Sequence, residues 1–144
     1  MEKEKILVSA CFTSEGYKYS GGANINQKIL ELKEKYDFVL ICPEVFGGLT
    51  VPRYPSEIVG DKVLNSIGED VTEAFNLGAK MALELAQKYN CKKAILKAKS
   101  PSCGKGMVYD GTFSHKTIKG NGVAATLLIE NGIEVYTEDE LDKI

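Results

Sequence analysis

Short apolar runs alternate along this sequence with longer stretches whose apolar residues recur at helical spacing. The runs have the length and composition of buried strands, and we expect strands at 5–10, 38–41, 93–98 and 133–136. The stretches with helical spacing predict helices at 25–35, about 70–89 and 122–131. Strands that alternate with helices are typical of a mainly parallel sheet with helices on both faces. The sequence therefore predicts an α/β fold.

Local signals mark several of these elements more closely. Asp70 is suited to cap the second helix, and Gly132 is suited to end the third. A weaker signal indicates a small hairpin at 59–66. The buried side of the first helix is expected to consist of Ile25, Ile29, Leu30 and Leu32.

The composition limits the class of protein. The 144 residues fit one domain spanning 1–144, and 44% hydrophobic with 26% charged residues is typical of a globular chain. The net charge of −2 provides no broad basic surface, so we expect no long nucleic acid as a partner. The apolar run at 6–8 is too short for a signal peptide or a membrane span. We therefore expect a cytoplasmic protein without membrane contact, whereas its oligomeric state is not predicted.

Three of the four cysteines lie where predicted strands end. Cys11 and Cys42 follow the first two strands, and Cys103 lies early in the loop after the third. In open α/β sheets ligands bind beyond the carboxyl ends of the strands, so the three thiols converge if these strands are neighbours. Cys91 precedes the third strand and belongs to the opposite edge of the sheet.

Metal binding or catalysis explains such cysteines better than disulfides do, because the cytoplasm is reducing. Converging thiolates suit a soft metal ion or an iron–sulfur cluster. The ligands are dispersed over three loops, so their spacing does not distinguish zinc from a cluster. A third interpretation is that the cysteines are small buried hydrophobic residues.

Polar residues near the cysteines supply candidate chemistry. Glu44, two residues after Cys42, is a candidate proton carrier, or alternatively a loop acid or helix cap. Arg53 lies between two prolines and would present a fixed guanidinium to an anionic or carbonyl-bearing substrate, unless it forms a surface salt bridge. The hydroxyls of Ser100 and Ser102 are candidates to hydrogen-bond a substrate or a cluster sulfur.

Three other features carry weaker signals. His115, the only histidine, has no partner visible in the sequence, so we expect it in a solvent-exposed loop. The segment 21–24 precedes a helix and could bind an anion, but it lacks the glycine spacing of a nucleotide-binding loop. The segment 109–113 is expected to be a turn.

The cysteines belong to a series of short motifs that extends from Val8 to about Val135. These motifs are Val8-Ser9-Ala10-Cys11, Tyr19-Ser20-Gly21, Cys42-Pro43-Glu44-Val45, Gly47-Gly48-Leu49, Pro52-Arg53, Ser100-Pro101-Ser102-Cys103-Gly104 and Tyr109-Asp110-Gly111-Thr112-Phe113. Together they resemble the DUF523 family, which includes the thiouracil desulfidases.

The resemblance implies a single DUF523 domain folded as a Rossmann-like, three-layer α/β sandwich. It also implies an oxygen-sensitive [4Fe-4S] cluster held by Cys11, Cys42 and Cys103, whose fourth iron has no protein ligand. The implied activity is desulfuration, without net redox chemistry, of a thiolated pyrimidine such as 2- or 4-thiouracil or its nucleotide. The alternative is a non-catalytic iron–sulfur or zinc module for sulfide storage or redox sensing.

The resemblance also assigns roles to the polar residues. Glu44 would transfer protons and Ser100 would assist it, whereas Arg53 and Ser102 are expected to contact the substrate. The first loop departs from the family pattern, since Phe12-Thr13-Ser14 stands where many members have Leu-Leu-Gly, so the exact thio-substrate is not predicted. Relatives that act on tRNA carry an additional domain, and the length of this chain therefore favours a free base or nucleotide.

Overall fold

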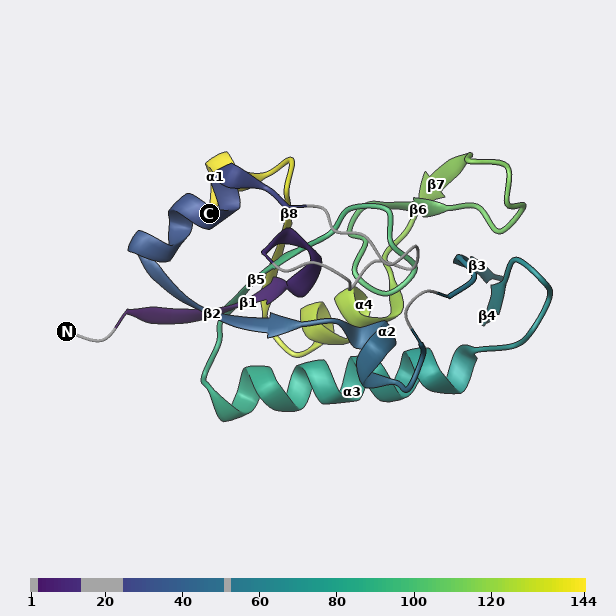
Figure 1. Cartoon of the computed structure of the whole chain (residues 1–144), viewed down its shortest axis with the longest axis horizontal. Helices are drawn as coiled ribbons and strands as arrows, with labels where there is room; N and C mark the ends of the chain where they lie inside the picture. The colour runs from purple at the N-terminus through teal and green to yellow at the C-terminus, as the bar shows by residue number, and fades with distance from the viewer. Residues whose placement is uncertain (1–2, 14–24, 51–52) are drawn as a thin grey trace.

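The computed structural model of the chain describes residues 3–13, 25–50 and 53–144. Within these ranges, a four-stranded parallel sheet with the order β2-β1-β5-β8 runs through the centre (Figure 1). Its strands are β1 (Glu4–Ser9), β2 (Tyr36–Ile41), β5 (Lys93–Leu96) and β8 (Glu134–Thr137). Each predicted strand is found with its ends within two residues of the expected positions. The predicted α/β fold with a parallel sheet is therefore confirmed.

Helices cover both faces of the sheet (Figure 1). Helices α3 (Thr72–Lys88) and α4 (Val123–Glu130) lie against one face. Helix α1 (Gln27–Glu31), continued by a 3-10 turn at Leu32–Glu34, lies against the other together with the 3-10 turn Leu141–Lys143. This is the expected three-layer arrangement. None of the helices in the described ranges is long and apolar enough to cross a membrane.

Alternation along β1 builds the core on both faces of the sheet. Ile6 and Val8 pack with Ile29 of α1, whereas Leu7 points to the opposite face and belongs to the same cluster as Leu128 of α4. All five side chains are fully buried. Because full burial of one such side chain contributes about 1.5–3 kcal/mol, the strand is held firmly between the two helical layers.

The first helix is shorter than the sequence predicts. The N-cap is Asn26, whose side chain accepts a hydrogen bond from the backbone N–H of Ile29 at 3.2 Å. Ile25 precedes this cap and is 56% exposed, so the prediction that it is buried is wrong. Apolar spacing continues upstream of the helix, but the capping hydrogen bond determines where the helix begins.

Two antiparallel hairpins lie beyond the carboxyl ends of the parallel strands (Figure 1). Strands β3 (Ser56–Val59) and β4 (Lys62–Asn65) form a hairpin where the sequence indicated one, although it begins at Ser56 rather than at residue 59. Strands β6 (Met107–Tyr109) and β7 (Thr117–Lys119) form a second hairpin, of which only the turn was predicted. Strands of three residues are too short to show alternation, and so the sequence did not reveal them.

The N-cap of α3 is Val71, so the prediction that Asp70 caps this helix is wrong by one position, although Asp70 still contacts the first residue of the helix. The Oδ1 atom of Asp70 accepts hydrogen bonds from the backbone N–H of Thr72 at 2.9 Å and from its hydroxyl at 2.6 Å. These hydrogen bonds lower the pKa of the Asp70 carboxyl group. The Thr72 hydroxyl also accepts a hydrogen bond from the backbone N–H of Val63 at 2.9 Å, which ties the helix to β4.

The short helix α2 (Pro43–Phe46) follows β2 and packs directly against α3. A Cβ atom on Gly78 of α3 would lie 1.8 Å from the carbonyl oxygen of Pro43, and Gly47 makes a similarly close approach to the backbone of α3. Only glycine allows two backbones to come so near. Because α2 carries Glu44, this contact helps to position a candidate site residue.

The substitution Gly78→Ala is expected to lower the free energy of unfolding by about 1–3 kcal/mol, because the methyl group would force α2 away from α3. Denaturation in guanidinium chloride measures this effect. Asn76→Ala, on the exposed side of the same helix, is the matched control and should change stability by less than about 0.5 kcal/mol. Equal unfolding free energies for the two variants would contradict the close packing.

Candidate active site

A cavity of about 470 Å³ opens at the carboxyl edge of the sheet. Its walls come from the segments that follow β1, β2 and β5 and from both hairpins. It is lined by all the residues that the sequence singled out as candidates for the site: Cys11, Cys42, Glu44, Arg53, Ser100, Ser102 and Cys103. The volume falls within the range of about 300–1,000 Å³ that is usual for small-molecule sites.

The three thiols reach this cavity from three different segments. Cys11 lies in the 3-10 turn Ala10–Phe12 after β1, Cys42 is the N-cap of α2, and Cys103 lies in the loop after β5. All are free thiols. Charge on Cys11 or Cys42 raises the pKa of Cys103, so the three are close enough to interact electrostatically. Cys91 instead belongs to the hydrophobic core at the amino end of β5.

Burial dominates the chemistry of these thiols. It raises the pKa of Cys103 to about 12, and it also raises the pKa of Cys42. The hydroxyls of Ser9 and Ser102 oppose the shift at Cys103 by hydrogen bonding to its sulfur, which lies 3.7 Å from the Ser102 oxygen. A bound cationic centre would favour the thiolate forms, because it supplies the positive charge that the buried sulfurs lack.

This set of donors fits a soft metal centre. Three sulfur ligands suit soft metals and iron–sulfur clusters. In the described part of the chain, no three His, Cys, Asp or Glu side chains converge closely enough to hold one metal ion. The three cysteine thiols, which reach one cavity from three segments, fit the ligand type of an iron–sulfur cluster.

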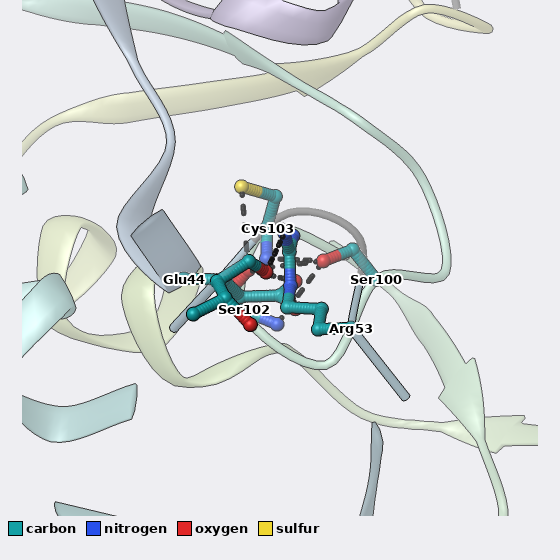
Figure 2. Close-up of polar contacts among 6 residues, drawn as sticks. Glu44, Arg53, Ser100, Ser102 and Cys103 are labelled. Atoms are coloured by element: carbon teal, nitrogen blue, oxygen red, sulfur yellow. Dashed lines mark hydrogen bonds and ion pairs between the residues drawn. The ribbon is translucent and has the colours of Figure 1, made fainter. Parts of the chain in front are cut away.

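A chain of polar contacts runs beside Cys103 (Figure 2). The Nε atom of Arg53 donates to Oε1 of Glu44 at 3.1 Å, and the Arg53 side chain is only 8% exposed. The Ser102 hydroxyl donates to Oε2 of Glu44 at 3.2 Å and lies 3.0 Å from the Ser100 hydroxyl. Both oxygens of Glu44 are therefore engaged, which fixes the position of its carboxylate.

Backbone contacts set the direction of this chain. The Ser100 oxygen accepts hydrogen bonds from the N–H groups of Ser102 and Cys103, both at 3.1 Å. The Ser100 hydroxyl proton is therefore directed toward the Ser102 oxygen. The single proton of Ser102 can serve either Glu44 or the Cys103 sulfur, and the carboxylate is the nearer acceptor. Hydrogen bonding thus runs from Ser100 through Ser102 to Glu44.

The start of α4 holds the turn that carries both serines. The carbonyl oxygen of Ser102 accepts hydrogen bonds from the N–H groups of Ala124 at 2.8 Å and Ala125 at 3.0 Å. A Cβ atom on Gly122 would lie 2.5 Å from that same oxygen, so this position accommodates only glycine without displacing the turn. The first turn of α4 thereby sets the position of Ser102.

Further residues line the same cavity although the sequence did not assign them to it. They include Glu57 of β3 and, from the β6–β7 hairpin, Tyr109 and Phe113. His115 is exposed, as expected, yet it also lines the cavity and meets the Tyr109 ring edge-on, with 6.4 Å between ring centroids. Hairpin pairing brings these residues to the cavity, and no local sequence pattern predicts such a contact. The candidate anion-binding segment at 21–24 lies outside the described residues.

Comparison with known proteins identifies the family. Residues 6–140 match the model of the 2-thiouracil desulfurase family. The chain belongs to this family. The predicted relationship to the thiouracil desulfidases is therefore confirmed.

Two relatives support this family membership. The Bacillus subtilis (strain 168) protein YbbK, described as uncharacterized, is 42% identical over 149 residues, which cover 96% of this chain and 99% of YbbK. The solved structure of a [4Fe-4S]-dependent thiouracil desulfidase, TudS, a DUF523 protein, is 39% identical with a TM-score of 0.90. That match covers 98% of this chain and 95% of TudS, so the whole fold is shared within the family.

In the metal-free protein, Cys91 and Cys103 are expected to react slowly with iodoacetamide. Burial raises the pKa of these thiols to about 11 and about 12, so the reactive thiolate is scarce near neutral pH. While the pH is below these pKa values, the labelling rate should increase about tenfold for each unit by which the pH is raised. Mass spectrometry at several pH values measures it, with protein unfolded in guanidinium chloride as the control. Rapid labelling of Cys103 in the folded protein would contradict its burial.

Proposed function

We propose that this chain is a [4Fe-4S]-dependent enzyme that removes sulfur, without net redox chemistry, from a thiolated pyrimidine such as 2- or 4-thiouracil or its nucleotide. The family match and the likeness to a solved thiouracil desulfidase support this proposal. The observation that carries it is the single cavity lined by three cysteines, a carboxylate and two serine hydroxyls. Its volume suits a small base rather than a long nucleic acid.

Cys11, Cys42 and Cys103 are the residues that would hold the cluster. With three protein ligands, one iron of the cluster would have no ligand from this chain, and the bound cluster would supply a soft Lewis acid for the thiocarbonyl sulfur. The hydroxyl of Ser9 hydrogen-bonds to the Cys103 sulfur, and a hydrogen bond of this kind orients and tunes a metal ligand.

Replacement of sulfur by water requires proton transfer but no change in electron count. The carbon–sulfur double bond becomes a carbon–oxygen double bond, and the two protons of water leave with the sulfide. Glu44 is the proposed group that accepts and returns a proton, at its Oε2 atom. The Ser102 and Ser100 hydroxyls are hydrogen-bonded in series to this oxygen and provide a path for the proton.

Arg53 holds the other oxygen of this carboxylate. Its Nε donates to Oε1 of Glu44, and its Nη1 donates to the carbonyl oxygen of Thr50 at 3.2 Å. The ion pair leaves Oε2 as the oxygen that handles the proton. Arg53 and Ser102 also line the cavity, and both remain proposed substrate contacts in addition to their contacts with Glu44.

Replacing any one of Cys11, Cys42 and Cys103 by alanine is expected to abolish most cluster binding, because each removes one of three ligands. Cys91→Ala is the matched control and should retain the cluster, since Cys91 lies in the core. Iron and sulfide analysis with visible absorption after anaerobic reconstitution measures the effect. Loss of the cluster in a folded Cys91→Ala protein, or zinc without iron in the anaerobically purified parent, would contradict the assignment.

Glu44→Gln is expected to lower kcat for sulfide release from thiouracil by about 10²–10⁴-fold, as for loss of a general acid–base group. Ser100→Ala should lower kcat less, because it interrupts only the relay. Both variants should bind a full cluster. Glu84→Gln, on the exposed side of α3, is the matched control and should retain full activity. Absence of sulfide release from both 2- and 4-thiouracil by the cluster-loaded parent would refute the proposed function.

A further inference from the structure

Glu57 is a second carboxylate in the wall of the cavity. It lies on β3, is only 8% exposed, and lines the same cavity as the three cysteines. Its Oε1 atom accepts hydrogen bonds from the backbone N–H groups of Gly111 at 2.9 Å and Phe113 at 3.2 Å. A single oxygen of Glu57 thus holds the loop between β6 and β7 against β3.

That loop has an unusual backbone conformation. Phe113 and His115 have φ angles of 57° and 63°, which residues other than glycine seldom adopt. Gly111 has a φ of 90°, and a Cβ atom there would lie 2.7 Å from the carbonyl oxygen of Ile58. Strained backbone persists where surrounding contacts hold it, and it is common at ligand sites. Here the contact with Glu57 holds the backbone of Phe113, which lines the cavity, as does Tyr109.

The other oxygen of Glu57, Oε2, remains available as an acceptor. Among the described residues, no group donates a hydrogen bond to Oε2 and no cation forms an ion pair with Glu57. Glu44 differs, because both its oxygens are engaged. Lys97, a cation that also lines the cavity, is paired with Glu138 at 2.8 Å.

A carboxylate oxygen beside aromatic side chains has a clear chemical preference. It accepts a hydrogen bond from an N–H group, and the flat rings of Phe113 and Tyr109 can pack against another flat ring. A thiouracil offers both features, since its planar ring carries N–H groups next to the carbon–sulfur bond. Methylation of a ring nitrogen removes that donor without changing the planar ring.

We infer that Glu57 is a substrate-recognition residue whose Oε2 accepts a ring N–H of the thiolated pyrimidine while Oε1 holds the aromatic wall against which that ring lies. The inference rests on the proposed function, because it names the residue that recognises the substrate of the proposed desulfidase site. It assigns separate tasks to the two carboxylates of the cavity. Glu44 handles the proton, and Glu57 selects a ring that carries an N–H donor.

Glu57→Gln separates the two tasks of this side chain. A glutamine keeps a carbonyl oxygen for the N–H groups of Gly111 and Phe113, but it presents an NH₂ donor in place of Oε2. We expect kcat/KM for 2-thiouracil to fall by about 10–100-fold, mostly through KM, because a hydrogen bond to a charged group is lost. The melting temperature and the visible absorption of the cluster should remain those of the parent. Glu84→Gln is the control for loss of one negative charge.

Two further measurements test the recognition itself. The parent should discriminate against 1-methyl- or 3-methyl-2-thiouracil, and Glu57→Gln should lose that discrimination. Uracil contains the same N–H groups but no sulfur, so calorimetric titration of the cluster-loaded protein under anaerobic conditions reports binding without turnover. The dissociation constant for uracil should rise about 10–100-fold in Glu57→Gln.

Three outcomes overturn the inference. They are unchanged uracil affinity in Glu57→Gln, absence of uracil binding by the parent, and equal discrimination between methylated and unmethylated substrates in parent and variant. Failure of the proposed function is distinguishable from these results. A cluster-loaded parent that binds uracil through Glu57 but releases no sulfide from any thiouracil would refute the activity and leave the recognition role in place.

Discussion

Parallel pairing of β1 with β2 and β5 is the constraint on which the site depends. The register places Ser9 opposite Ile41 of β2 and Val8 opposite Ile95 of β5, so the three strands end at one edge of the sheet. The cysteine-bearing segments therefore leave from adjacent strands. A shift of one residue along β1 would turn Leu7 toward the wrong helical layer, so burial of the apolar side chains fixes the register. The stability of the core and the convergence of the thiols thus have the same origin.

The sequence is sufficient to predict this edge because the signals that specify it are local. Short apolar runs predict the strands, and Cys11 and Cys42 directly follow two of them. Gly132 marks the end of α4 as predicted and adopts a φ of 84°, which glycine reaches without strain. Ile25 shows the limit of such reasoning, since helical spacing extends upstream of a cap whose position depends on one hydrogen bond.

The partners of the polar side chains are not predictable in the same way, because they depend on contacts between distant segments. Ser102 and Glu44 are 58 positions apart, and they meet because α4 holds the serine turn while α3 holds α2. Glu57 reaches Gly111 across 54 positions through the packing of two short hairpins. Arg53 is only nine positions from Glu44, yet sequence reasoning left a substrate contact and an ion pair as alternatives.

The two carboxylates of the cavity have different environments, and this difference is the basis for the two roles proposed for them. Glu44 meets a guanidinium and a hydroxyl, and the hydroxyl is a group through which a proton can move. Glu57 meets only backbone N–H groups among the described residues, which cannot pass a proton onward but do fix a loop. The first is positioned by α2 against α3, and the second by a hairpin beyond the sheet. Under the proposed roles, a change in the hairpin loop is expected to alter the choice of substrate without displacing the cysteines or the proposed proton relay.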